Sequence, residues 1–442
     1  MSGFYFWPLA RVMAMPRTLF TTSLKQKTIY MRIINTLILA MLSLAACAQT
    51  KPKVVLVIAD GIPADVIERL RPPAMQQIIN EGAYIRAHVG GTKGTYTETP
   101  TISAPGYNDM LTGTWGYKHN VWDNDNQHPN YNYPTIFRLF KTAKPAGTTA
   151  IFSTWVENRK MLLGTGLPQT QNLSVDYVYD GFEKDTAHFP HDKAGLYMNQ
   201  IDDHVVNCAD SVIREKAPDL SWIYLEYTDD VGHSKGTGKE FDKAIGLLDE
   251  RMKKIAAAIH YREAKFKEKW LLVITTDHGR DPVNGHGHGG QSERERTTWM
   301  ILNKPVTNAY LKYAQPGIVD ILPSVANYLN INLPAPIKRE LDGVPITGPV
   351  SLSNATLDTT AQGFTVKWKT FAPAEKLKVY ITYTNNVKEG KADTYKLIGT
   401  PTSGAQKFSY TSAGLVGQPF YKVVIEGKHN TVNVWHVVKP VK

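Results

Sequence analysis

The chain has 442 residues, which is long for one ordinary domain and enough for a large catalytic core with an accessory module. Hydrophobic residues make up 42% and charged residues 20%, so intrinsic disorder is excluded as the default state. The net charge of +10 suggests an anionic partner, but the first 47 residues carry five basic side chains and no acidic one, which leaves +5 on the rest. Without a long basic run, we expect a small anionic substrate and no nucleic-acid-binding domain.

Residues 1–48 predict an export segment. Met31 and Arg32 open a basic start, and residues 33–44 are mostly apolar but too short to span a bilayer comfortably as a mature helix. The small residues ending at Cys47 resemble a bacterial lipobox, and they also fit an ordinary signal-peptidase site. We expect export to the periplasm or cell surface, with membrane attachment only through a lipid on Cys47. A buried core helix is disfavoured because small residues follow the apolar run as a cleavage site requires.

Residues 53–349 alternate between strand and helix patterns. Four apolar runs predict buried strands, at 54–59, 222–225, 271–276 and 299–302. Spacings of three and four predict a helix between the second and third strands, with a buried stripe of Phe241, Ile245, Leu248, Met252, Ile255 and Ile259. This alternation favours an α/β catalytic domain with a mostly parallel central sheet sandwiched by helices, where ligands bind beyond the carboxyl ends of the strands.

Residues 351–442 have a different pattern. Helical periodicity stops, and short strand-like runs such as 364–368 and 378–383 are separated by turn residues. This pattern predicts a separable all-β sandwich, without which the catalytic domain would still fold. The spacing from Leu415 to Tyr421 is that of a tyrosine corner, and Trp368 would be an early core residue. The segment therefore resembles a fibronectin type III domain.

Acidic and histidine residues follow three of the predicted strands. Asp60 follows the first, Asp229 and His233 the second, and Asp277 and His278 the third. Carboxylate oxygen and imidazole nitrogen together suit zinc. Each signal has an ordinary alternative, since an Asp–Gly pair is often a turn and an Asp after a strand can cap a helix. Their combination predicts two neighbouring cations, about 4 Å apart in two-metal hydrolases.

A glycine-rich loop with two histidines, His286 and His288, follows the third strand closely. Histidines are common in surface loops, so neither one alone indicates a ligand. Their closeness to Asp277 makes the loop a plausible contributor to the metal site.

Ser103 is the candidate nucleophile. A serine hydroxyl has too high a pKa to attack at neutral pH, and coordination to zinc lowers it. We expect Pro105 and Gly106 to hold Ser103 on a sharp turn. Without metals nearby, the same segment would be a solvated turn rich in Ser and Thr.

Residues 103–124 closely resemble the nucleophile segment of the nucleotide pyrophosphatase/phosphodiesterase branch of the alkaline phosphatase superfamily. The shared pattern is a nucleophile, a Pro, Thr-Gly, an aromatic residue, a His and Asp-Asn, here Ser103, Pro105, Thr112, Gly113, Trp115, His119, Asp123 and Asn124. Residues 229–233 and 277–279 match two further motifs, and residues 320–323 and 341–343 resemble the superfamily's C-terminal region. The resemblance covers roughly residues 53–350.

The resemblance implies a site for two Zn2+ ions. One ion would be bound by Asp60, Ser103, Asp277 and His278. The other would be bound by Asp229, His233 and His288, and His286 is the alternative to His288. Asn124 would donate to a non-bridging phosphoryl oxygen. The nucleophile is Ser where many members of the branch have Thr. The Lys-x-Arg clamp of some monoesterase relatives is not obvious, and Arg159 stands nearest to its position as a substrate-binding candidate.

The implied function is hydrolysis of a small phosphoester through a phosphoseryl intermediate. A phosphodiester or pyrophosphate is the first expectation and a phosphomonoester, as in alkaline phosphatase activity, the second. Sulfatase relatives carry an x-Pro-x-Arg context after the nucleophile, and Gly106 and Tyr107 replace it here, which argues against a sulfatase. A surface-exposed binding lipoprotein with a degenerate core is the alternative from another class, disfavoured because all expected ligands are present. The sequence assigns no oligomeric state.

Overall fold

The structure is a computed structural model, and it describes residues 3, 31, 51–125, 128–193 and 195–438. Residues Lys51–Lys442 form one compact unit, which is separate from residues 1–50. The predicted export segment, with Cys47, lies outside the described residues apart from Gly3 and Met31. Within the described ranges, no helix combines the length and the apolar character that a membrane crossing needs.

A seven-stranded sheet forms the centre of the catalytic part, in the order β2-β7-β6-β1-β5-β3-β4. Its strands are β1 (Pro52–Ala59), β2 (Ala83–His88), β3 (Thr149–Ser153), β4 (Tyr177–Tyr179), β5 (Leu220–Leu225), β6 (Lys269–Thr275) and β7 (Thr297–Leu302). The five strands from β6 to β4 run parallel, while β7 is antiparallel to β6 and β2 is antiparallel to β7. The prediction of a mostly parallel α/β sheet is confirmed.

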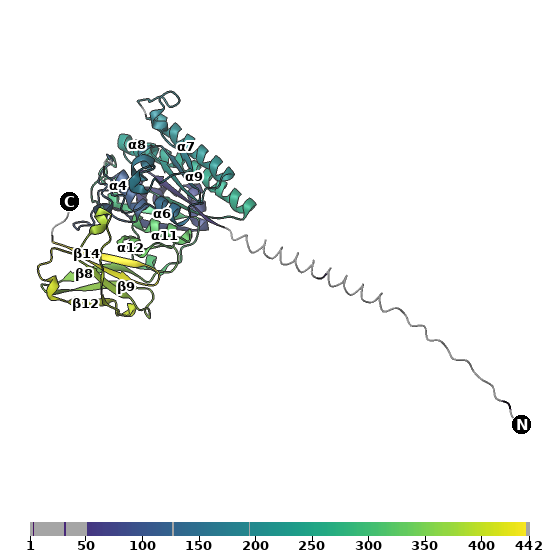
Figure 1. The fold of residues 1–442 in the computed structure, drawn as a ribbon. Helices are drawn as coiled ribbons and strands as arrows, with labels where there is room; N and C mark the ends of the chain where they lie inside the picture. The colour runs from purple at the N-terminus through teal and green to yellow at the C-terminus, as the bar shows by residue number, and fades with distance from the viewer. Residues whose placement is uncertain (1–2, 4–30, 32–50, 126–127, 194, 439–442) are drawn as a thin grey trace. The chain divides into compact units, whose positions relative to one another are not determined.

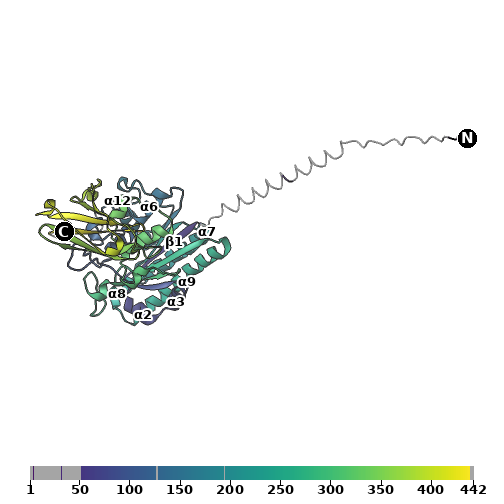
Figure 2. The same cartoon turned by 90° about the horizontal axis from the view of Figure 1, so that it is seen from below.

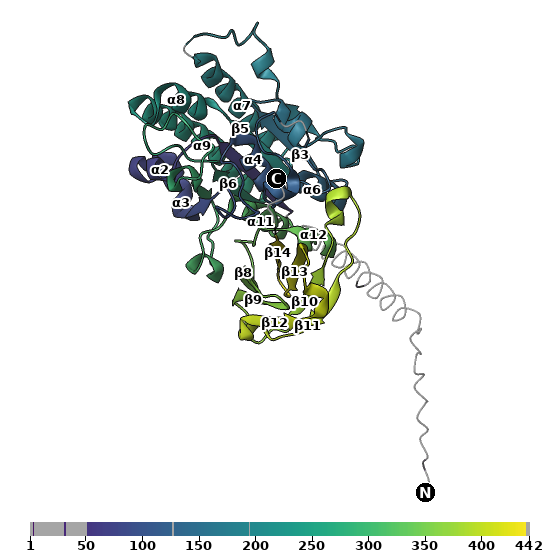
Figure 3. The same ribbon diagram turned by 90° about the vertical axis from the view of Figure 1, so that its left-hand side faces the viewer.

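Helices cover both faces of this sheet (Figures 2 and 3). Alternate residues of β1 point to opposite faces, so Val54, Leu56 and Ile58 enter one core and Val55, Val57 and Ala59 the other. Facing the second core are α2 (Ala64–Leu70), α3 (Pro73–Glu81), α7 (Leu196–Glu215) and α9 (Lys239–Phe266). Facing the first are α4 (Ser103–Thr112), α6 (Ile136–Ala143) and α11 (Ile321–Tyr328). The other α-helices of the described residues are α5 (Gly116–His119), α8 (Tyr227–Lys235), α10 (Glu293–Arg296) and α12 (Ala335–Glu340).

Helix α9 confirms the periodicity noted in the sequence. All six residues of the predicted stripe are at most 1% exposed. The stripe packs against α7, α3 and the sheet, which explains why a 28-residue helix carries one continuous apolar face.

The C-terminal region is all-β, as predicted, and its strands lie next to the catalytic part in Figure 1. Its strands are β8 (Leu352–Thr359), β9 (Gly363–Thr370), β10 (Lys378–Thr382), β11 (Lys396–Gly399), β12 (Lys407–Thr411), β13 (Phe420–Glu426) and β14 (Thr431–Val437). They form two antiparallel sheets, β11-β10-β13-β14 and β12-β9-β8. Trp368, Leu415 and Tyr421 are buried in its core. A fibronectin type III assignment stays a prediction.

Two lysines are buried between the catalytic part and the C-terminal sheets. Lys118 of α5 bonds to Asp342 and, at 3.2 Å, to Asn433 of β14. Lys422 of β13 pairs with Glu340 of α12 at 2.9 Å and with Asp393 at 2.8 Å. One apolar cluster also continues from the catalytic sheet into β8, β9 and β13. The domain division near residue 350 stays a prediction, but this shared core argues against independent folding of the two parts.

We expect Lys422→Ala to lower the free energy of unfolding by about 3–5 kcal/mol, because it leaves two buried carboxylates unpaired. Urea unfolding followed by circular dichroism measures the loss. The matched control is Lys367→Ala, which breaks the exposed ion pair of Lys367 with Asp358 and should cost less than about 1 kcal/mol. Equal losses in the two variants would contradict a buried, shared interface.

Candidate active site and metal centre

Ser103 lies at the N-terminus of helix α4, where it is 7% exposed. The expectation of a sharp turn is therefore wrong: Ser103 is the first helical residue, and Pro105 fits the first turn because the amides there have no helical partner. Gly106 is required for a different reason. A Cβ on it would lie 2.8 Å from the carbonyl oxygen of Asp277, so the missing side chain lets α4 approach the end of β6.

Asp229 and His233 lie one turn apart on helix α8, which follows β5. A regular helix brings their side chains together, because residues at i and i+4 share a face. Gly232 has another role here. A Cβ on it would lie 2.1 Å from the guanidinium carbon of Arg280, so only glycine leaves room for that side chain.

Four of the predicted ligands converge where β1 and β6 end. The Nε2 atom of His278 lies 3.4 Å from Asp60 Oδ1, 3.3 Å from Asp277 Oδ2 and 3.4 Å from Ser103 Oγ. The described residues offer no hydrogen bond to either of these two carboxylate oxygens, although both are buried. The carbonyl of Gly279 accepts a 2.8 Å bond from His278 Nδ1, which turns the lone pair of Nε2 toward them.

These orphaned atoms fit a metal ion. Two carboxylate oxygens, an imidazole lone pair and the Ser103 hydroxyl face one point, and the single hydroxyl proton can satisfy only one of the three acceptors; buried oxygens left without a partner are otherwise costly. The donor set is one that zinc accepts. A cation held by Asp60, Asp277, His278 and Ser103 would satisfy all four.

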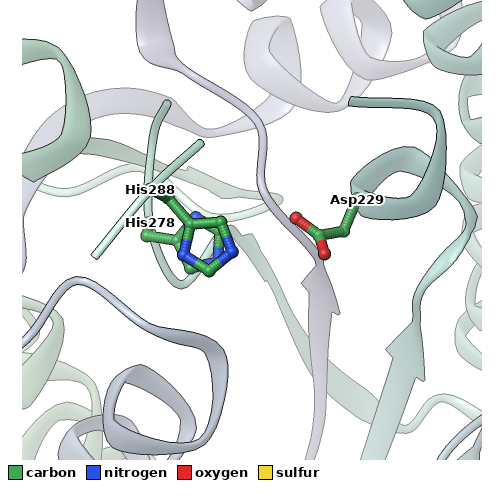
Figure 4. Close-up of side chains that lie close together, drawn as sticks. All are labelled: Asp229, His278 and His288. Atoms are coloured by element: carbon green, nitrogen blue, oxygen red, sulfur yellow. The ribbon is translucent and has the colours of Figure 1, made fainter. Parts of the chain in front are cut away.

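A second group lies beside the first and consists of Asp229, His278 and His288, as Figure 4 shows. The rings of His278 and His288 are stacked with centroids 3.7 Å apart, and the carboxylate of Asp229 faces them from α8. His233 closes the group, with its Nε2 atom 3.2 Å from Asp229 and 3.1 Å from His288. The structure thus brings all seven predicted ligands together, with His278 between the two sets.

His288 and His286 lie in different environments. The carbonyl of Thr101 accepts a 3.0 Å bond from His288 Nδ1, while the Nε2 atom of that ring faces His233. His286 is exposed and donates from Nδ1 to the backbone carbonyl of His233. This contrast supports His288 as the ligand.

Burial and charge crowding perturb the carboxylates. Burial, reinforced by the charge of Asp229, raises the pKa of Asp60 to about 7. Burial and then the charge of Asp60 raise the pKa of Asp277 well above its usual value. Burial opposes ionisation of Asp229 too, but the His233 hydrogen bond and the Arg280 charge together hold its pKa below the ordinary value. Among the described residues, the guanidinium of Arg280 is the one that pairs with these three buried carboxylates, and bound cations would supply further positive charge.

Arg280 is a site residue that the sequence analysis missed. It is fully buried and forms an ion pair with the Asp229 carboxylate. It also donates to the carbonyl oxygens of Asp229 at 2.8 Å, Gly61 at 3.0 Å and His286 at 3.2 Å. One side chain thereby ties β1, α8 and the histidine loop together. Its place directly after the 277–279 motif was the available signal.

The two substrate-binding candidates differ. Asn124 lies beside the nucleophile, since its Oδ1 accepts a 3.0 Å hydrogen bond from the amide of Ala104. The amino end of its side chain is then the end that can donate to a ligand. Arg159 forms a two-bond pair with Asp180, at 2.6 and 3.0 Å. These bonds hold the Nε and Nη2 donors of Arg159 against Asp180, and among the described residues no hydrogen bond joins Arg159 to Ser103. A role of Arg159 in substrate binding stays a prediction.

A family model of type I phosphodiesterase / nucleotide pyrophosphatase matches residues 54–330. The chain belongs to this family. Among curated proteins it is 26% identical over 206 residues to a 2,3-bisphosphoglycerate-independent phosphoglycerate mutase of Mycoplasma mycoides subsp. mycoides, covering 46% of this chain and 36% of the mutase. It is 23% identical over 238 residues to bis(5'-adenosyl)-triphosphatase enpp4 of Xenopus laevis, covering 52% and 47%.

The chain thus spans less than half the length of these curated relatives. Among solved structures, murine ectonucleotide pyrophosphatase / phosphodiesterase 5 in complex with AMP matches with a TM-score of 0.45 and 13% identity, covering 64% of this chain and 96% of that one.

We expect His288→Ala to lower the zinc content of the protein by about one ion per chain, because it removes a ligand and the stacking partner of His278. His286→Ala is the matched control and should keep the wild-type content. Metal analysis after zinc loading and gel filtration measures both. The reverse pattern would move the ligand assignment to His286.

Proposed function

We propose that this protein is a two-zinc phosphoester hydrolase that uses Ser103 as a covalent nucleophile and acts on a phosphodiester or pyrophosphate. The observation that carries the proposal is the convergence of Ser103 Oγ, His278 Nε2 and two orphaned carboxylate oxygens at the N-terminus of α4. Membership in the phosphodiesterase family agrees with it. Export, with or without a lipid on Cys47, stays a prediction.

The chemistry assigned to the chain is in-line displacement. Ser103 Oγ releases its proton to solvent and forms a bond to phosphorus while the bond from phosphorus to the leaving oxygen breaks. The leaving oxygen departs with the electron pair of that bond and takes up a proton from solvent. Bound zinc would lower the pKa of the serine hydroxyl and stabilise charge on the leaving oxygen. Water then displaces Ser103 from phosphorus and restores the hydroxyl.

The N-terminus of α4 and Asn124 serve the same phosphoryl group. The N-terminal end of the helix, which carries a partial positive charge, lies at Ser103. This end favours the binding of an anionic phosphoryl group over the binding of a neutral ligand. Asn124 is oriented by the amide of Ala104 so that its amino group can donate to an equatorial oxygen. Both act where negative charge increases in the transition state.

A phosphomonoester is the second candidate substrate, and the similarity to a phosphoglycerate mutase favours keeping it. The pairing of Arg159 with Asp180 weighs against it, because a monoester needs an additional cation for its second negative charge. A binding protein with a degenerate core is disfavoured by the completeness of the ligand set.

We expect zinc-loaded protein to hydrolyse bis(p-nitrophenyl) phosphate with a higher kcat/KM than p-nitrophenyl phosphate, and p-nitrophenyl sulfate least. Release of p-nitrophenol measures all three, with and without a chelator. A preference for the monoester would select the second candidate. Absence of hydrolysis in a protein with bound zinc would count against a hydrolase of aryl esters.

We expect Ser103→Ala to lower kcat by several orders of magnitude while the fold is kept, because it removes the attacking oxygen. Ser103→Thr should be milder, since a threonine alkoxide can do the same chemistry. Thr99→Ala and Thr101→Ala are the controls, as a misaligned motif would put the nucleophile at one of them. Wild-type kcat in Ser103→Ala would overturn the assignment of this segment.

A further inference from the structure

The carboxylate of Asp60 is held by two buried tyrosines. Tyr224 of β5 donates to Asp60 Oδ2 at 2.7 Å, and Tyr107 of α4 donates to the same oxygen. The two hydroxyl oxygens lie 2.8 Å apart. Tyr107 is 0% and Tyr224 3% exposed, so water does not compete for these bonds.

This arrangement divides the two oxygens of Asp60 between two tasks. Oδ2 receives two hydroxyl donors, whereas Oδ1 has no hydrogen-bond partner among the described residues and lies 3.4 Å from His278 Nε2. A carboxylate free to rotate could present either oxygen, or both, to a cation. The tyrosines oppose that rotation, because a carboxylate turned away from them would leave the Tyr224 hydroxyl without its acceptor and Tyr107 with only the Tyr224 oxygen, 2.8 Å away.

The tyrosine rings are themselves fixed. Tyr107 packs edge-on against Trp155 and Trp222, with ring centroids 6.3 and 6.4 Å apart, and against Tyr224 at 4.9 Å. Tyr107 also lies one helical turn after Ser103 on α4. One helix therefore sets both the position of the nucleophile and the orientation of Asp60.

We propose that Tyr107 and Tyr224 are positioning residues that hold Asp60 for coordination through Oδ1 alone, to the cation that also contacts Ser103. The inference rests on the proposed function, since it takes that cation to be present. The tyrosines act through Asp60 and contact no substrate. A carboxylate held this way loses less freedom on binding, and supporting residues of this kind typically contribute 10- to 100-fold to metal affinity.

The test compares Tyr107→Phe, Tyr224→Phe and the double variant, each of which keeps the ring and removes only the hydroxyl. We expect zinc affinity, measured by competition with a chromophoric chelator, to fall about tenfold in the single variants and further in the double variant. The absorption spectrum of the cobalt-loaded protein should change as well, because Asp60 can then rotate. Tyr310→Phe is the matched control, since Tyr310 donates at 2.8 Å to Asp320 and both residues are buried.

Unchanged zinc affinity and cobalt spectrum in the double variant would overturn the inference. An equal fall in Tyr310→Phe would also overturn it, because the effect would then be general destabilisation. A wild-type chain that binds no zinc would overturn it with the metal site itself. A wild-type chain that binds zinc but hydrolyses no phosphoester would remove the proposed function and leave the positioning result valid.

Discussion

The structure depends on the burial of three carboxylates, Asp60, Asp229 and Asp277, at one edge of a parallel sheet. Like charges brought this close out of water repel strongly, and burial raises the cost. The buried guanidinium of Arg280 pairs with Asp229, and two tyrosine hydroxyls donate hydrogen bonds to Asp60. Two oxygens without a hydrogen-bond partner among the described residues, Asp60 Oδ1 and Asp277 Oδ2, lie close to His278 and Ser103, and this unbalanced charge makes the edge a candidate metal site.

The surrounding backbone is built so that these groups can approach. The parallel strands β1, β5 and β6 end at the same edge, which brings residues more than 200 positions apart into contact. Gly106 allows helix α4 to pack closely against the segment that follows β6, and Gly232 allows the Arg280 side chain to pack against helix α8. Small residues at these points are therefore requirements of packing around the site.

The C-terminal sheets also contact the segment that carries the nucleophile. Residues 341–343 and 320–323, which resemble the superfamily's C-terminal motifs, contribute two aspartates with structural roles, Asp320 buried and Asp342 half-buried. Asp342 accepts from Lys118 and from the amide of Trp115, while Asp320 accepts from Tyr310 and the amide of Val344. Lys118 also donates a hydrogen bond to Asn433 of β14. Residues 103–124 are therefore stabilised by contacts with both the catalytic part and the C-terminal sheets.

The sequence by itself determined the α/β class, the buried stripe of α9 and the acidic and histidine residues at the strand ends, because periodicity and strand-end chemistry are local patterns. The choice of Ser103 and His288 as further ligands came from the resemblance to a known family. It could not show that Ser103 begins a helix or that His233 reaches Asp229 through a regular helical turn, since both depend on what packs nearby. The predicted separation near residue 350 rested on the local loss of helical periodicity. The shared core and the buried Lys422 depend on contacts between residues that are far apart in the sequence. The roles of Tyr107 and Tyr224 became visible only in three dimensions, because a side chain that orients a ligand is defined by its contacts and carries no spacing of its own.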